Sequence, residues 1–315
     1  RKEHALQQAI SSEYDVIVCG GGLAGLCAGI TALQNGASVA LFEKSPDTGG
    51  SAKLSGGAIW GFTDFDRIRS IVPDGDAVLQ YQVFEEMDEA RDWLEAQGAK
   101  LEPRIERAHL GRSDRHMDPP QSMEALTRTF VDSGGNLFPA HAMLSLLSSD
   151  DGAVCGVRVV NEGVARNVRS KAVVLATGGF QGNSELLTRY IVRNASNVTL
   201  RANPWSTGDG FIAATDLGAA VSAGLNTFYG HCMVAPPAHV TSDDFRDVTQ
   251  WYSQRSIAVN VHGERFTDET DGTTDQNLNQ LLAQQPKGWG VLIIDDAIMQ
   301  SEAVAGRPGW GTIPA

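Results

Sequence analysis

The hydrophobic positions of the first 45 residues follow two different periods. Tyr14 to Cys19 is a short apolar run that Gly20 to Gly22 end abruptly, which predicts a buried strand. From Leu23 to Asn35 the apolar residues recur at helical spacing until Gly36, and residues 38–42 form a second buried run. Strand, helix and strand within about 30 residues predict a βαβ unit with two parallel strands.

The remainder of the chain alternates between longer helices and short strands. A glycine-rich loop is expected over Glu43–Thr63, helices over Asp76–Gln97, Met123–Val131, Gly210–Leu217 and Asp275–Gln284, and strands over Leu137–Leu147, Ala153–Val160, Lys171–Ala176, Ile257–Val261 and Gly290–Ile294. Beyond Asn226 the periodicity weakens and Pro, Asp, Ser and Thr become more frequent. The pattern therefore predicts an α/β protein with two domains, residues 1–226 and 227–315.

Composition and charge restrict the functional classes. With 25 basic and 38 acidic residues the net charge is −13, which disfavours binding to nucleic acid. No apolar run reaches the roughly 18 residues of a transmembrane helix, so no transmembrane segment is expected. The four cysteines have neither CxxC spacing nor disulfide density, which predicts no metal site and a reducing, cytoplasmic setting.

A nucleotide-binding motif occupies the turn between the first strand and helix. Gly20, Gly22 and Gly25 have the spacing GxGxxG, and Glu43 ends the second strand 18 residues after Gly25. The first glycine permits the tight turn, the second lets the backbone approach a pyrophosphate at the helix N-terminus, and the third lets the helix pack on the strand. A carboxylate at Glu43 suits a ribose hydroxyl. These features predict a dinucleotide site without separating FAD from NAD.

Three further segments resemble one family of flavoproteins. They are the glycine-rich loop Gly49 to Gly57 after Glu43-Lys44, the segment Ala176 to Phe180 with Asn183, and Thr207 to Gly210 leading into Ala213, Gly218 and Ala219. Together they resemble the fumarate reductase/succinate dehydrogenase flavoprotein family, in its soluble branch of fumarate reductases, tricarballylate dehydrogenases and 3-ketosteroid Δ1-dehydrogenases. The resemblance implies a Rossmann-like FAD-binding domain of the glutathione-reductase type, with a smaller α+β capping domain. It disfavours an NAD-dependent dehydrogenase.

The resemblance also implies which residues contact FAD. To Gly20, Gly22 and Gly25 of the nucleotide-binding motif it adds Ala24, Glu43, Lys44, Ser51, Ser55, Gly56, Gly57, the backbone near Met143 at the adenine, Thr177, Gly178 and Asp209. Asp209 alternatively serves only as a helix cap. Members of the family that attach FAD covalently do so through a His in the loop 49–57, and this loop contains none, which implies non-covalent FAD.

The capping segment supplies the substrate-side candidates. His231 falls where the family places a substrate-binding His, and a protonated imidazole stabilises developing negative charge; alternatively it is a histidine without a ligand. Where fumarate reductases place an Arg that delivers a proton, this chain has Thr273 or Thr274, and threonine cannot replace a guanidinium. Arg265 is expected to pair locally with Glu269 or Asp268.

The sequence supports more than one functional class. Nothing after Leu292 resembles the family's C-terminal return to the FAD domain, so either the chain is a fragment or another chain completes the site. We expect an FAD-dependent oxidoreductase that acts on a CH–CH bond beside a carboxylate or ketone, favouring the dehydrogenase direction, with a small-molecule substrate and an unidentified electron acceptor. The alternatives are a flavin-binding homologue without activity that has a binding or regulatory role, and a fumarate reductase-like enzyme with a replaced proton donor.

Overall fold

A computed structural model describes residues 9–107, 111–222, 224–235, 238, 240–241, 244, 248–250, 255–269 and 275–301. By its internal contacts the chain divides into two compact units. The first unit comprises Arg1–Gly178 and Asp209–Leu217, and the second comprises Gly179–Gly208 and Gly218–Ala315. The domain boundary expected after residue 226 stays a prediction. No helix in the described part of the chain is long and apolar enough to cross a membrane.

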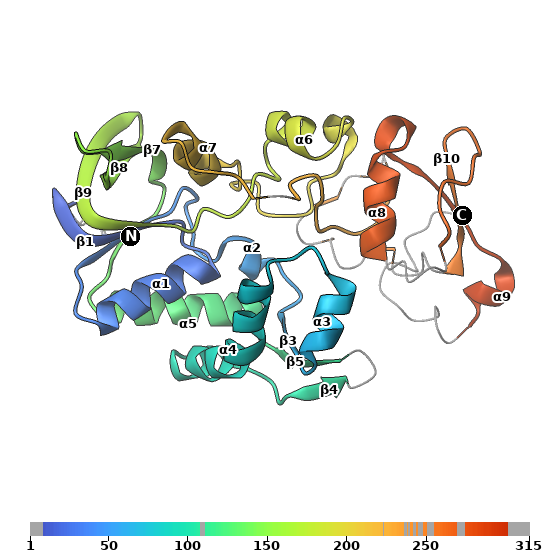
Figure 1. Ribbon diagram of the computed structural model, residues 1–315, viewed down its shortest axis with the longest axis horizontal. Helices are drawn as coiled ribbons and strands as arrows, with labels where there is room; N and C mark the ends of the chain where they lie inside the picture. Colours follow the sequence, from blue (N-terminus) through green and yellow to red (C-terminus); the bar gives the residue numbers. More distant parts are fainter. Residues whose placement is uncertain are drawn as a thin grey trace, which may run out of the picture. The chain divides into compact units, whose positions relative to one another are not determined.

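A six-stranded sheet of order β6-β2-β1-β9-β8-β7 forms the centre of the first unit. Figure 1 labels four of its strands, β1, β7, β8 and β9. Its strands are β1 (Glu13–Cys19), β2 (Val39–Phe42), β6 (Asn136–Phe138), β7 (Ala142–Ser148), β8 (Val154–Asn161) and β9 (Val164–Leu175). The pairs β1–β2, β2–β6 and β1–β9 are parallel, whereas β7, β8 and β9 pair antiparallel. The carboxyl ends of four strands therefore meet at one edge, where open α/β sheets bind their ligands.

Alternating side chains of the parallel strands fill two hydrophobic layers. On one face, Val18, Val39 and Leu41 pack with α1 (Leu23–Gln34) and α5 (Pro119–Asp132), which lie side by side in Figure 1. On the other face, Ile17 and Phe42 pack in a cluster that includes Ala213 of α7 (Asp209–Asp216). The predicted βαβ unit is confirmed: β1 and β2 are parallel, both of their faces are buried, and α1 packs on one face with its apolar side.

Two sequence expectations for the first unit are wrong, and the strand expected over Lys171–Ala176 is too short, because β9 begins at Val164. The loop expected over Glu43–Thr63 contains α2 (Gly50–Lys53) and β3 (Ala58–Phe62). The strand expected over Leu137–Leu147 is two strands, because Ala140 between β6 and β7 has a φ of 56°, in the left-handed region. The apolar run therefore predicted the residues of β6 and β7 but not the turn between these two strands.

A small antiparallel sheet, also in the first unit, was not predicted. It has the order β3-β5-β4, with β4 at Ile105–Arg107 and β5 at Arg112–His116, and α3 (Phe65–Ile71) and α4 (Ala77–Ala96) accompany it. Arg91 of α4 is buried and donates to Asp88, to the hydroxyl and carbonyl oxygens of Ser113, and to the carbonyl of Ile59. These bonds fasten α4 to both β3 and β5.

The second unit contains shorter elements. They are α6 (Ser184–Tyr190), η2 (Ala195–Asn197), β10 (Ile257–Asn260), α8 (Asp275–Ala283), η4 (Pro286–Gly288), β11 (Gly290–Ile293) and α9 (Asp296–Met299). Strands β10 and β11 pair antiparallel. Leu278 of α8 packs in a cluster with Cys232 and Ala258, and Ala283 packs with Val192 and Ala195. The predicted helix at 275–284 and strands at 257–261 and 290–294 are confirmed within one residue at each end.

Candidate functional site

The glycine turn after β1 has a different requirement at each glycine. A Cβ at Gly20, whose φ is 109°, would overlap the carbonyl of Ala176, and one at Gly25 would overlap the carbonyl of Gly20. A Cβ at Gly22 would meet nothing closer than the Cα of Gly50, 3.9 Å away. Packing therefore demands glycine at the first and third positions. The second position faces open space at the N-terminus of α1, and helix N-termini are sites where phosphates bind.

Glu43 joins this turn to the end of β2. Its side chain is only 7% exposed, and its carboxylate accepts hydrogen bonds from the backbone N–H of Gly21 at 2.6 Å and of Ser45 at 2.7 Å. A carboxylate has about four acceptor positions, so about two are left for a ribose hydroxyl. Sequence reasoning assigned Glu43 only to the ligand, and the structure adds a role in holding the turn.

The glycine-rich loop 49–57 is attached to the same turn. The Gly49 N–H donates to the carbonyl of Gly21 at 2.8 Å. Farther along, Ser55 accepts from the N–H of Gly57 at 3.1 Å, and Gly57, with a φ of 79°, lies against the carbonyl of Met117. Five predicted contact residues are exposed, namely Ala24, Ser51, Ser55, Gly56 and Gly178. The loop thus presents hydroxyls and uncovered backbone beside the glycine turn, which suits the close approach of a ligand.

Two later segments of the chain complete the edge. Asp209, the first residue of α7, forms an ion pair with Lys44, with 2.6 Å between Nζ and Oδ2. A Cβ at Gly210 would overlap the hydroxyl of Thr177, so the beginning of α7 packs directly on the residue that follows β9 by two positions. Gly178 comes next, with a φ of 72°. Asp209 is therefore more than a helix cap, because it pairs with a side chain from the end of β2.

The adenine-side candidate, Met143, is buried in the core near the start of β7. The turn before it is tied to the end of β2, since the N–H of Ala140 donates to the carbonyl of Ser45 at 2.9 Å and that of His141 to Glu43 at 2.8 Å. The structure thus brings the glycine turn, Glu43, the Lys44–Asp209 pair and the turn before Met143 to one edge of the sheet, whereas Gly57 lies against Met117. The individual contacts of the predicted residues with FAD stay predictions.

This edge fits a flavin dinucleotide. Because Gly22 has no Cβ, the open space beside it is suited to a pyrophosphate. The remaining acceptor positions of the Glu43 carboxylate are suited to ribose hydroxyls. The exposed hydroxyls of Ser51 and Ser55 supply adaptable donors and acceptors for the rest of the cofactor.

His231 lies in the second unit and is buried, with 8% of its surface exposed. Its Nε2 is 3.0 Å from the hydroxyl of Tyr229, and the two rings meet edge to face at 5.3 Å. Next to it, Gly230 faces the amide of Asn279, whose buried Nδ2 and Oδ1 have no hydrogen-bond partner among the described residues. Neither Tyr229 nor Asn279 was predicted, because the polar residues of an irregular segment and a helix carry no sequence signal for this proximity.

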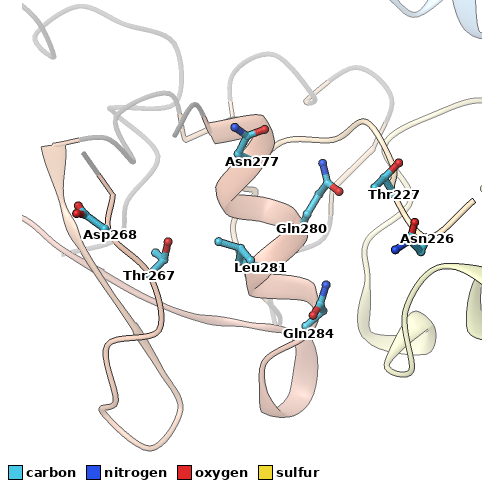
Figure 2. Close-up of a pocket in the computed structure, with 8 residues that line it drawn as sticks. All are labelled: Asn226, Thr227, Thr267, Asp268, Asn277, Gln280, Leu281 and Gln284. Carbon is cyan, nitrogen blue, oxygen red and sulfur yellow. The ribbon is translucent and has the colours of Figure 1, made fainter. Parts of the chain in front are cut away.

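A polar groove of about 470 Å³ lies along α8 (Figure 2). Figure 2 shows Asn277, Gln280 and Leu281 on the helix and Gln284 directly after its end. Thr267 and Asp268 flank them on one side, and Asn226 and Thr227 on the other. The lining consists mainly of amides and hydroxyls with one carboxylate, and it includes no basic residue. The groove therefore suits neutral polar groups better than anions.

The turn after β10 contains the predicted local ion pair. Arg265 bonds to Glu269 with 2.6 Å between Nη2 and Oε2, and the same carboxylate accepts from the N–H of Ala258 at 2.6 Å. The bond from Arg265 is the main cause that lowers the pKa of Glu269. Glu269 is only 3% exposed, whereas the Arg265 side chain is 54% exposed, so the pair has a buried carboxylate and a solvated guanidinium. Thr273 and Thr274, the positions of the missing Arg, lie outside the described residues.

Comparison with known proteins defines the class to which this fold and site belong. Residues 15–304 match the model of the family described as FAD binding domain. The chain therefore belongs to this family, and its cofactor is FAD. The predicted Rossmann-like FAD-binding fold and the choice of FAD over NAD are confirmed.

The relatives are oxidoreductases. The chain is 28% identical to a fumarate reductase (cytochrome) of Shewanella frigidimarina, over 95% of this chain and 55% of that protein. It is 22% identical to a 3-oxosteroid 1-dehydrogenase of Mycolicibacterium smegmatis, over 82% of this chain and 62% of that protein. The chain thus spans little more than half the length of these relatives. The resemblance stated from the sequence motifs is confirmed.

A solved structure shares the fold. The 3-ketosteroid-Δ4-(5α)-dehydrogenase of Rhodococcus jostii, in complex with 4-androstene-3,17-dione, superimposes with a TM-score of 0.73 at 21% identity. The match covers 94% of this chain and 69% of that one. At this level of identity the comparison concerns the fold alone.

Proposed function

We propose that the chain belongs to an FAD-dependent oxidoreductase that acts on a CH–CH bond beside a carboxylate or ketone. The observation that carries this proposal is the convergence of the glycine turn, Glu43 and the Lys44–Asp209 pair at one edge of the parallel sheet. The relatives support the substrate class, because fumarate bears carboxylates and a 3-oxosteroid bears a ketone.

The first unit would hold FAD without a covalent bond. The N-terminus of α1 at Gly22 binds the pyrophosphate, Glu43 accepts from the ribose, and the loop 49–57, which has no His, borders the flavin. When bound, FAD supplies the two-electron chemistry that no side chain provides. Flavin released into the supernatant by acid precipitation supports this attachment, and flavin that stays with the precipitated polypeptide refutes it.

The second unit would supply the substrate contacts. His231 has its Nε2 held by Tyr229, and such an imidazole orients a substrate carboxylate or polarises a carbonyl. The buried amide of Asn279 offers a further donor and acceptor near this segment. Because threonines stand where the family's proton-delivering Arg is expected, we favour oxidation of a saturated bond over fumarate reduction.

Turnover measurements test this function. FAD-loaded wild-type protein is assayed with succinate, tricarballylate and 3-ketosteroids and an artificial electron acceptor, and with fumarate and a reduced dye. Replacement of His231 by Ala should lower kcat/KM about 10²-fold or more if it stabilises charge, whereas Tyr229→Phe, which keeps the ring, should have a smaller effect. Wild-type activity in His231→Ala contradicts its role.

Two other outcomes distinguish the alternatives. FAD-loaded protein inactive with every substrate favours the flavin-binding homologue with a regulatory role, which the missing Arg also supports. Fast fumarate reduction favours the reductase with a replaced proton donor. The native electron acceptor and a cytoplasmic location belong to the same proposal, and the location is supported by four free cysteines.

A further inference from the structure

The turn between β6 and β7 is held rigidly beside the end of β2. Ala140 takes a left-handed φ of 56°, which a non-glycine residue keeps only where its surroundings require it. Hydrogen bonds from Ala140 to Ser45 at 2.9 Å, from His141 to Glu43 at 2.8 Å and from Asn161 to Ala140 at 2.9 Å fix it. The fold therefore places His141 next to the residue proposed to bind the ribose.

The ring of His141 has a defined hydrogen-bonding pattern. Its Nδ1 lies 2.8 Å from the carbonyl oxygen of Pro139, which can only accept, so Nδ1 carries the proton. In the neutral ring Nε2 is then an acceptor, and among the described residues no partner occupies it. The ring packs on two buried aromatic side chains, Phe42 at 6.1 Å and Phe138 at 5.7 Å between centroids.

The order of groups along the edge bears on where the base of a bound cofactor would lie. The pyrophosphate belongs at the glycine turn and the ribose at Glu43. Glu43 bonds to Gly21 through one carboxylate oxygen and to Ser45 through the other, and Ser45 bonds to the turn that bears His141. A base attached to that ribose on the side away from the glycine turn would lie toward Ser45 and His141.

We propose that His141 selects the base of the dinucleotide, with its Nε2 accepting a hydrogen bond from the exocyclic amino group of adenine. This inference rests on the proposed binding of FAD at the edge. A base with a carbonyl oxygen at that position, such as hypoxanthine, would set two acceptors against each other, which costs affinity. His141 thus acts as a specificity-determining residue.

The test uses the purified chain and two ligands, FAD and its deaminated analogue flavin hypoxanthine dinucleotide. Dissociation constants at pH 8 are measured by flavin fluorescence titration. The wild type should prefer FAD by about 10-fold, the equivalent of one hydrogen bond. His141→Phe keeps a ring against Phe42 and Phe138 but has no acceptor, so the preference should disappear with an unchanged melting temperature.

Two further variants keep the test decisive. His141→Gln, whose amide can rotate to donate or accept, should bind both ligands with similar affinity and covers the case in which the Phe variant misfolds. His262→Phe, at an exposed histidine of the second unit, should keep the wild-type preference. Equal wild-type affinities, or a preference retained in folded His141 variants, would overturn the assignment. Failure of the wild type to bind either flavin would overturn the proposed function and this inference with it.

Discussion

Lys44 and Asp209 lie 165 positions apart in the chain and form an ion pair of 2.6 Å. The pair joins the residue that follows Glu43 to the first residue of α7. Both side chains are largely buried, with 22% and 27% of their surface exposed, and Gly210 packs on Thr177 beside them. The ion pair therefore fixes the start of α7 at the edge that we assign to FAD.

We expect this pair to contribute measurably to both stability and flavin affinity. Double-mutant cycles with Lys44→Met and Asp209→Asn should give a coupling free energy of about 0.5–2 kcal/mol in urea unfolding, above the typical value for exposed pairs. FAD affinity should fall in each single variant. Additive effects on unfolding would show that the two side chains do not stabilise each other.

Two glycines of the same motif should respond differently to alanine. Gly22→Ala adds a methyl group into open space, so the melting temperature of the flavin-free protein should be nearly unchanged, while FAD affinity should fall at least 10-fold because the methyl group occupies the phosphate position. Gly25→Ala overlaps the Gly20 carbonyl and should lower the melting temperature itself. Thermal unfolding and flavin titration measure both. Equal behaviour of the two variants would contradict this division of roles.

Glu43 should affect folding as well as the cofactor. Glu43→Ala leaves the N–H groups of Gly21 and Ser45 without their acceptor, which costs about 1–3 kcal/mol for buried donors. Loss of a charge-assisted bond to ribose should also weaken FAD binding roughly 10–150-fold. Urea unfolding without flavin and titration with FAD separate the two effects. Flavin affinity equal to wild type in a folded variant would remove Glu43 from the ribose site.

The Arg265–Glu269 pair predicts a pH dependence of stability. In the folded state the hydrogen bond that Glu269 accepts from Arg265 lowers the pKa of Glu269 below its ordinary value of 4.5. The stabilisation is therefore fully present at pH values above that ordinary value and is lost as the pH falls through the lower folded pKa. Glu269→Gln should destabilise the protein at pH 7 and make its decline in stability under acid shallower.

A matched pair provides the control for this experiment. Arg189 and Glu185 are also four residues apart in the second unit, at 2.9 Å, but both are exposed. Glu185→Gln should change the free energy of unfolding in urea by no more than about 0.5 kcal/mol between pH 3 and 7. An equal effect of both substitutions would show that burial of Glu269 does not matter.

Much of the nucleotide edge could be predicted from the sequence because its signals are local. The periods of β1 and α1, the spacing of Gly20, Gly22 and Gly25 and the position of Glu43 lie within one short segment. Burial on both strand faces produces the continuous apolar runs, and close packing demands glycine at positions 20 and 25. The sequence by itself thus determined the βαβ unit and the kind of ligand.

Only the tertiary structure decided which distant side chains meet there. Strand β5 has the sequence Arg-Ser-Asp-Arg-His, which has no apolar period, and it exists because β3 and β4 pair with it and Arg91 bonds to it. The ion pair of Lys44 with Asp209 and the proximity of His141 to Glu43 likewise depend on strand order in the sheet. The hydrophobic period of a segment indicates which of its side chains are buried. The partner of a polar side chain depends instead on how the chain topology arranges the elements.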